Sequence, residues 1–271
     1  MWKISAPVVV GVDGSDAAIN AAKWAIDEAI SRDVPLRLVH VTHIEGQPAA
    51  SEDEFRLEVQ YAESSLRAAT AAVEATGKHV KIETEILWGS PANVLINESR
   101  NASMVCVGSV GIGTIASEVM GSTAAGLAEN AYCPVAIIRY PHNPPASSPD
   151  WITLVVDHRA DNEAVIEHAM DEARLRNAPI LAIGVRGRDF EEPSNDELDR
   201  RIEKWKKQYP DVHVHPVTSH ASFAHFLADN KDESVQLAVI DSADAANVAR
   251  IVGPHSHALV AHGECSVLVV H

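Results

Sequence analysis

Short runs of apolar residues alternate along this chain with longer segments in which apolar residues recur every three or four positions. In the first half, the apolar runs cover residues 6–12, 36–41, 104–107 and 135–138, and residues 80–87 alternate between apolar and polar. Continuous apolar runs are typical of parallel strands covered on both faces, and alternation is typical of a strand with one covered face. Five strands are therefore predicted in this half.

The segments between these strands have helical features. Ser15 or Asp16 can cap a helix whose alanines recur at helical spacing, and residues 54–75 form a long amphipathic pattern. Pro91 is placed for a helix start, and a further helix is expected over residues 122–130. The resulting order, βαβαβαβαβ, predicts a doubly wound parallel sheet of the α/β, Rossmann-like class.

The second half of the chain repeats the first. At a shift of 144 residues, the matches are Val12-Asp13 with Val156-Asp157, Asp27-Glu28-Ala29 with Asp171-Glu172-Ala173, and Pro35 with Pro179. The segment between the halves is rich in proline, which disfavours helix and sheet and favours an extended spacer. We therefore expect two tandem domains, residues 1–141 and 151–271, joined by a proline-rich linker over residues 142–150.

A glycine-spaced loop, Gly108-x2-Gly111-x9-Gly121-Ser122, follows the fourth predicted strand. Glycines at the end of a strand let backbone N–H groups approach an anion, and a hydroxyl at the next helix start can hydrogen-bond that anion. In a doubly wound sheet, ligands bind beyond the carboxyl ends of the strands. The sequence thus predicts a phosphate-binding crevice. The residues expected to converge on it are Asp13, Gly14, Val41, Gly108 and Gly111.

Composition and charge argue against several classes of partner. The chain has 271 residues, of which 46% are apolar, and a formal net charge of −16, which repels nucleic acids and anionic membranes. Its basic cluster, residues 200–207, is interleaved with acids, as on the solvent face of a helix. Apolar runs fall well short of the ~20 residues of a membrane span, and the N-terminus lacks a signal-peptide pattern, so a cytoplasmic protein is expected. Cys106, Cys133 and Cys265 lie in or beside apolar runs and are expected to be buried thiols.

Three motifs together carry a family resemblance: residues 8–15 (VVVGVDGS), Gly89-Ser90-Pro91, and the glycine loop. The first half resembles the ATP-binding branch of the universal stress protein family, and the whole chain resembles tandem two-domain members from mycobacteria. This resemblance implies an adenine-nucleotide-binding fold in both halves and ATP as the ligand of the first. It implies that Asp13 lies beside the nucleotide and that Val41 contacts adenine through its backbone. The residues it implies for the phosphates and ribose are Gly108, Gly111, Gly121 and Ser122.

Neighbouring residues complete the expected site. The amides of Ser109, Val110 and Thr123 are further candidate donors, and Gly14 and Ser15 share the turn that carries Asp13. Asp13 is also the residue that would hold Mg²⁺ or a ribose hydroxyl. Each assignment has a structural alternative, because glycines also make turns, an aspartate also starts a helix, and a valine that ends a strand also belongs to the core.

The second half departs from the glycine motif. The positions of Gly108, Gly111 and Ser122 are taken there by Asp241, Asp244 and Pro254. Two carboxylates that face a triphosphate would repel it by on the order of several kcal/mol at low dielectric, and proline lacks both an N–H group and a hydroxyl. We therefore expect one nucleotide per chain, bound in the first half.

The last strand of each half is the candidate for assembly. Residues 135–139 and 266–270 are apolar and rich in β-forming residues. In the resembled family, the last strand pairs across a two-fold or pseudo-two-fold interface. The two segments are thus expected to pair either within one chain or between the chains of a homodimer.

The expected function is that of a nucleotide-dependent stress-response regulator without dedicated turnover. The sequence shows no nucleophile with a matching base, no acid pair at hydrolytic spacing, and no Gly-Lys-Ser/Thr motif that would place a lysine on the γ-phosphate. The histidine pairs His213/His215 and His255/His257 lack a third ligand at zinc spacing. Two alternatives stay open. One is an adenylating or ATP-hydrolysing enzyme of the same fold, and the other is a nucleotide-free interaction scaffold.

Overall fold

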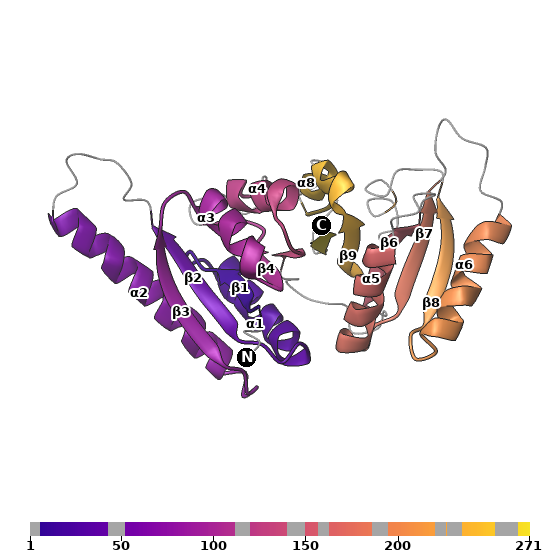
Figure 1. Cartoon of the computed structure of the whole chain (residues 1–271), viewed down its shortest axis with the longest axis horizontal. Coiled ribbons are helices and arrows are strands. Elements are labelled where there is room, and N and C mark those ends of the chain that lie inside the picture. The colour runs from indigo at the N-terminus through magenta and orange to yellow at the C-terminus, as the bar shows by residue number, and fades with distance from the viewer. Residues whose placement is uncertain are drawn as a thin grey trace, which may run out of the picture. The chain divides into compact units, whose positions relative to one another are not determined.

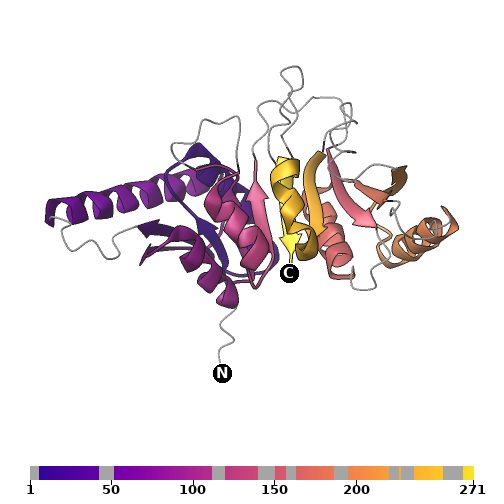
Figure 2. The same cartoon turned by 90° about the horizontal axis from the view of Figure 1, so that it is seen from above.

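The computed structural model of the 271-residue chain describes residues 6–42, 52–111, 120–139, 150–156, 163–185, 195–219, 226, 235–252 and 265–271. Helices and strands alternate along it (Figures 1 and 2), and it divides into two compact units, Met1–Tyr140 and Pro141–Val270. These are unit 1 and unit 2. Each is an α/β fold built on a parallel sheet, which confirms the predicted fold class.

Parallel strands form the sheet of unit 1 in the order β3-β2-β1-β4-β5. The strands are β1 (Val8–Gly11), β2 (Leu36–Thr42), β3 (Ile82–Trp88), β4 (Met104–Gly108) and β5 (Val135–Ile138). β1 lies between β2 and β4, because Val8 pairs with Leu36 on one side and with Met104 on the other. The strand order reverses between β1 and β4, which is the position where open α/β sheets bind their ligands.

Helices cover both faces of this sheet. The described helices of unit 1 are α1 (Asp16–Ser31), α2 (Glu52–Glu74), α3 (Pro91–Glu98), the short 3-10 helix η1 (Ser99–Asn101) and α4 (Ser122–Asn130). α1 packs beside α2, and α3 packs beside α4. The two pairs lie on opposite faces of the sheet. The chain first adds β2 and β3 on one side of β1, through α1 and α2, and then adds β4 and β5 on the other side, through α3 and α4. Because crossovers between parallel strands are right-handed, this change of direction places the second pair of helices on the other face.

The start of α1 is fixed by a side-chain cap. The Ser15 hydroxyl accepts a hydrogen bond from the Ala18 amide at 3.1 Å, so Ser15 and not Asp16 is the cap. The buried face of α1 is made mostly of alanine, with Ala18, Ala21 and Ala25 at 3% exposure or less. These small side chains let α1 lie close to β1 and β4, beneath the ends of the strands that carry the candidate site.

Unit 2 repeats this architecture in the part of the chain that the structure describes. Its strands are β6 (Trp151–Val156), β7 (Ile180–Val185), β8 (Val214–Ser219), β9 (Val235–Asp241) and β10 (Ser266–Val270). Their order, β10-β9-β6-β7-β8, is that of β5-β4-β1-β2-β3 in unit 1. The described helices are α5 (Glu163–Arg176), α6 (Asn195–Gln208), η2 (Ser242–Asn247) and α8 (Val248–Val252).

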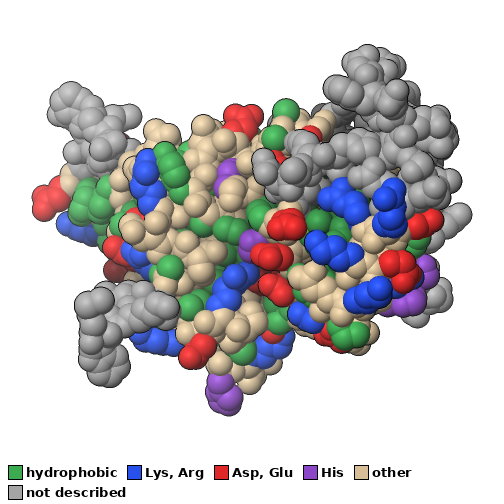
Figure 3. Space-filling model, turned by 45° about the vertical axis from the view of Figure 1, so that its right-hand side comes forward, with side chains coloured by type: hydrophobic (Ala, Val, Ile, Leu, Met, Phe, Trp, Pro, Cys, Tyr) green, Lys and Arg blue, Asp and Glu red, His purple; other side chains and the backbone are tan. Residues whose placement is uncertain are grey.

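Acidic and basic side chains are interspersed on the surface shown in Figure 3. On α6, Lys206 lies 3.0 Å from Glu203, and Lys204 lies 3.8 Å from Glu163 of α5. The basic cluster predicted on a solvent-exposed helix face is thus interleaved with carboxylates. Within the described ranges, no helix is long and apolar enough to cross a membrane.

The three cysteines are buried free thiols, as predicted. Cys133 and Cys265 occupy matching places, each just before the last strand of its unit. Burial raises the pKa of both thiols to about 12, so both stay protonated at neutral pH.

Candidate functional site

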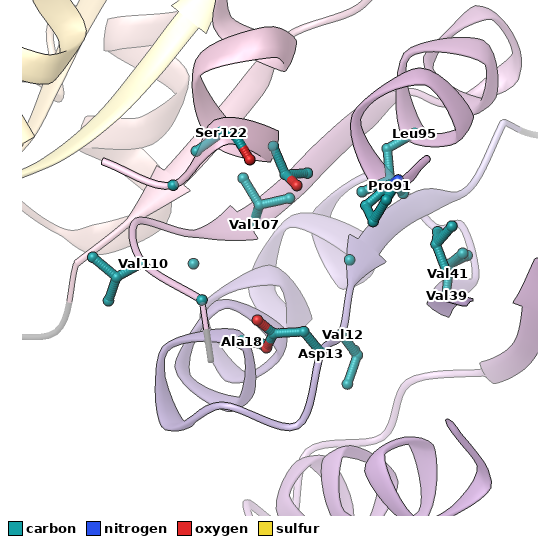
Figure 4. A pocket seen from close by; sticks show the side chains of 16 residues that line it. Val12, Asp13, Ala18, Val39, Val41, Pro91, Leu95, Val107, Val110 and Ser122 are labelled. Carbon is teal, nitrogen blue, oxygen red and sulfur yellow. The ribbon is translucent and has the colours of Figure 1, made fainter. Parts of the chain in front are cut away.

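A cavity of about 310 Å³ opens in unit 1 beyond the carboxyl ends of β1 and β4 (Figure 4). This volume lies at the lower end of the range for small-molecule sites. The cavity is at the point where the strand order reverses, as the doubly wound topology predicts. Its lining consists of Gly11, Val12, Asp13, Ala18, Val39, Val41, Pro91, Leu95, Val107, Gly108, Val110, Gly111, Gly121, Ser122, Thr123 and Ala124.

Eight of the eleven residues predicted for the site line this cavity: Asp13, Val41, Gly108, Val110, Gly111, Gly121, Ser122 and Thr123. They come from the ends of β1, β2 and β4, from the loop after β4, and from the first turn of α4. The remaining three, Gly14, Ser15 and Ser109, do not line it.

Two glycines leave room where side chains would collide. A Cβ atom on Gly108 would lie 2.7 Å from the backbone carbonyl carbon of Ala17 in α1, so only glycine allows this approach. A Cβ on Gly111 would lie 2.8 Å from Oδ2 of Asp13. At Gly108 and Gly111 the lining of the cavity is therefore backbone, and the Asp13 carboxylate lies directly against Gly111.

The first turn of α4 faces the same cavity. Its N-cap residue is Gly121, which offers no side chain to the free amides of the helix start. The following residues, Ser122 and Thr123, line the cavity and carry hydroxyls. A helix N-terminus with free N–H groups and hydroxyl side chains is a site that favours an anion.

Asp13 is held in a tight local turn. Its Oδ1 accepts hydrogen bonds from the amide of Ser15 at 2.9 Å and from the Ser15 hydroxyl at 2.6 Å. Its main-chain carbonyl accepts a hydrogen bond from the Tyr61 hydroxyl of α2 at 2.8 Å. With Oδ1 fixed in this way, Oδ2 is directed toward Gly111, and Figure 4 shows the carboxylate pointing toward the loop that carries Val110.

Gly14 and Ser15, which were also predicted as ligand-binding residues, make other contacts in the structure. Gly14 adopts φ +88°, and a Cβ there would lie 2.7 Å from the Tyr61 hydroxyl and 2.8 Å from Oγ of Ser65, so this glycine faces α2 and not the cavity. The Ser15 hydroxyl is used as the cap of α1 and as the donor to Asp13. Both residues shape the turn that presents Asp13.

The predicted role of the Ser109 amide also needs correction. This amide donates to the carbonyl of Ile138 at 3.0 Å, and the Ser109 carbonyl accepts from the Gly121 amide at 2.9 Å. Ser109 is only 3% exposed. It therefore extends the β4–β5 ladder by one hydrogen bond and closes the base of the glycine loop, instead of facing the cavity.

Sequence reasoning missed the apolar side of the cavity. Pro91 and Leu95 of α3 and Val39 of β2 line it, together with Gly11, on which a Cβ would lie 2.8 Å from Cδ1 of Leu95. The Gly89-Ser90-Pro91 motif was the available signal for this side, since it brings the start of α3 to the mouth of the cavity. The cavity thus has one apolar side and one side of backbone amides, hydroxyls and a carboxylate.

One titratable group lies beneath the Asp13 turn. His40 of β2 is 5% exposed and packs edge-on against Tyr61, with ring centroids 5.7 Å apart. Burial lowers the pKa of His40, while a hydrogen bond to the backbone of Val12 and the negative charges of Asp13 and Glu58 oppose this shift. The imidazole is therefore neutral at neutral pH.

The corresponding place in unit 2 carries an aspartate. Gly108, which ends β4, pairs with Ile138 of β5, and Asp241, which ends β9, pairs with Val270 of β10. The Asp241 carboxylate accepts a hydrogen bond from the Ala243 amide at 2.7 Å and caps η2. The aligned positions Asp157 and Pro254 lie outside the described residues.

Of the two histidine pairs noted in the sequence, one lies within the described residues. His213 and His215 are neighbours, with ring centroids 4.4 Å apart, whereas His255 and His257 lie outside the described residues. In the described parts of both units, no group of three or more histidine, cysteine or carboxylate side chains is arranged to hold a metal ion.

The proteins that this chain resembles in sequence and in fold come from one family. A sequence model of the universal stress protein family matches residues 6–139. A universal stress protein of Mycobacterium tuberculosis strain H37Rv, Rv2624c, is 52% identical over 266 residues, which cover 97% of this chain and 95% of the relative. Another from the same strain, Rv2028c, is 38% identical over 267 residues, with 97% and 95% covered.

A solved structure matches the fold over nearly the full length. The universal stress protein from Archaeoglobus fulgidus DSM 4304 superposes with a TM-score of 0.71 and covers 98% of this chain and 96% of its own. The sequence identity is 16%, so this match concerns the architecture alone.

Proposed function

This chain belongs to the universal stress protein family, and from that membership we propose that unit 1 binds ATP in the cavity beyond β1 and β4. In this proposal, ATP occupancy controls the affinity of the protein for a partner in a stress response. The observation that carries the proposal is that Gly108 and Gly111 line the cavity with backbone beside the start of α4, whose N-cap residue, Gly121, supplies no capping side chain.

The two sides of the cavity suit the two ends of a nucleotide. Adenine would lie against the apolar side, near Val39 and Val41, and the phosphates would lie at the amides of the glycine loop and at Ser122 and Thr123. Asp13 would bind a ribose hydroxyl or hold Mg²⁺ beside the phosphates, since Oδ2 faces the glycine loop while Oδ1 is engaged by Ser15.

We further propose that unit 2 binds no ATP. Asp241 stands at the place of Gly108, and its carboxylate already serves as the cap of η2. A side chain here replaces the bare backbone that Gly108 contributes to the cavity of unit 1, and its negative charge repels phosphate. Asp244, in the first turn of η2, adds a second negative charge nearby.

Regulation without dedicated turnover is the preferred role. The sequence has no Gly-Lys-Ser/Thr motif to place a lysine on the γ-phosphate, which favours slow hydrolysis at most. An adenylating or ATP-hydrolysing enzyme of the same fold is the second candidate, and a scaffold without nucleotide is the third.

A mass-spectrometric inventory of ligands released from the purified protein, combined with a phosphate and pyrophosphate release assay, separates the three functions. Bound ATP or ADP with slow turnover supports the regulator. Rapid pyrophosphate or phosphate release supports an enzyme. No bound nucleotide and no binding of added ATP would support the scaffold and contradict the proposal.

We also propose that β5 and β10 mediate assembly, either with each other or between two chains. Each is the last strand at one edge of the sheet of its own unit and presents backbone donors and acceptors for pairing. Ile137 and Val269 are fully buried, so a charge at either position would unfold its unit as well as weaken pairing. The mass of the intact protein by light scattering is therefore the better test, since a monomer favours pairing within one chain and a dimer favours pairing between chains.

A further inference from the structure

Helix α2 contacts the ligand-side turn of unit 1 although no residue of α2 lines the cavity. The Tyr61 hydroxyl donates a hydrogen bond to the main-chain carbonyl of Asp13 at 2.8 Å. Next to it, Gly14 has φ +88°, and a Cβ there would collide with both the Tyr61 hydroxyl and Oγ of Ser65. The turn after β1 is thus shaped to fit under α2, and glycine is required by both its backbone angle and this contact.

These contacts fix Asp13 from two sides. Ser15 holds Oδ1 of the carboxylate, and Tyr61 holds the carbonyl of the same residue. The other oxygen, Oδ2, is directed to Gly111 of the glycine loop, where a Cβ would lie 2.8 Å from it. The orientation of the carboxylate toward the cavity therefore depends on the orientation of the peptide that follows Asp13.

Tyr61 is itself held in place for this contact. The edge-on packing against the buried ring of His40, with 5.7 Å between centroids, limits where the phenol can lie. Tyr61 is nevertheless 45% exposed, so this tyrosine is not a core residue whose packing alone would explain it. The hydroxyl is the part of the side chain that reaches the turn.

We propose that Tyr61 is a positioning residue for the nucleotide: it holds the turn after β1 so that Asp13 presents Oδ2 to the ligand. This inference rests on the proposed binding of ATP in unit 1. The hydrogen bond from Tyr61 makes α2 part of the binding mechanism, and binding of ATP in turn stabilises the position of α2 against the turn.

Tyr61→Phe tests the hydroxyl without losing the packing on His40. We expect the Kd for ATP, measured by calorimetric titration of the full chain, to rise about fivefold, as for the loss of one ordinary hydrogen bond. The matched control is Tyr132→Phe, which removes a hydroxyl bonded to Arg100 and away from the cavity, and it should leave the Kd unchanged. An unchanged Kd for Tyr61→Phe would overturn the inference, whatever happens to the melting temperature, since a purely structural role affects only the latter.

A double-mutant cycle with Asp13→Asn shows whether Tyr61 acts through Asp13. On the Asp13→Asn background, Tyr61→Phe should raise the Kd by less than twofold, because residue 13 then has no carboxylate for the turn to orient. Effects that multiply fully would contradict the inference. If Asp13→Asn alone abolishes binding, the cycle cannot be completed, and the Kd of the Tyr61→Phe single variant decides whether Tyr61 is a positioning residue. Wild-type protein that binds no ATP would overturn the proposed function and this inference with it, whereas normal wild-type binding with an unaffected Tyr61→Phe variant would overturn the inference alone.

Discussion

Gly111→Asp should abolish ATP binding in unit 1. The substitution would place a Cβ 2.8 Å from Oδ2 of Asp13 and a carboxylate within the cavity that Gly111 lines. Two like charges ~4 Å apart repel by about 4 kcal/mol at an effective dielectric constant of ~20. A phosphate of ATP at a similar distance from the introduced carboxylate is repelled by a similar energy, so the Kd for ATP should rise by more than about 100-fold.

The assay is calorimetric titration with ATP, with the fold of each variant checked by thermal unfolding. Gly77→Asp is the matched control, because it adds the same charge at a position of unit 1 where a Cβ meets no atom within 4 Å. Its φ of +71° is one that aspartate tolerates better than most residues. Wild-type affinity in a folded Gly111→Asp protein would refute the placement of the phosphates at the glycine loop.

Two further predictions concern stability. Burial lowers the pKa of His40, so the unfolded chain takes up a proton near pH 6.5 while the folded chain does not. The contribution of His40 to the free energy of unfolding should therefore be complete above this pH. Below it, the free energy of unfolding should fall by up to about 1.4 kcal/mol per pH unit. Chemical unfolding at pH 7.5 and pH 5.5 should show a smaller loss in His40→Gln than in the exposed control His79→Gln, and equal losses would argue against this account. Gly108→Ala should destabilise unit 1 by about 1–3 kcal/mol in urea titrations, because its Cβ would lie 2.7 Å from the backbone of Ala17. Gly121→Ala, whose Cβ would meet nothing closer than 3.7 Å, should cost less, and the reverse ranking would contradict the close approach at Gly108.

The fold could be predicted well from the sequence because parallel strands buried on both faces have a distinctive composition. β1 and β5 appear as uninterrupted apolar runs, and both lie where those runs predict. β3 alternates and is shifted from the predicted residues 80–87 to Ile82–Trp88, since the ends of an alternating strand carry little information.

The lining of the cavity was predictable where a residue type has a steric reason for its position. Gly108 and Gly111 were identified from their spacing, and in the structure a Cβ would collide with the backbone of Ala17 at Gly108 and would meet the Asp13 carboxylate at Gly111. Gly14 and Ser109 were placed in the site because they adjoin site residues. Adjacency does not say which side of a turn a residue faces: Gly14 lies under α2, and the Ser109 amide continues the sheet.

The apolar side of the cavity was not predictable in the same way. Leu95 and Val39 have the residue types and the periodicity of ordinary core positions, and their place beside a cavity depends on where α3 crosses the sheet. Tyr61 was missed for a related reason, because a tyrosine on an amphipathic helix gives no sign that its hydroxyl reaches a turn 48 residues earlier.

The most direct test of a single nucleotide site in unit 1 is the stoichiometry of ATP binding to the full chain, measured by calorimetric titration after bound ligands have been removed. We expect one ATP per chain. Two equivalent sites, or none, would contradict a single nucleotide site in unit 1.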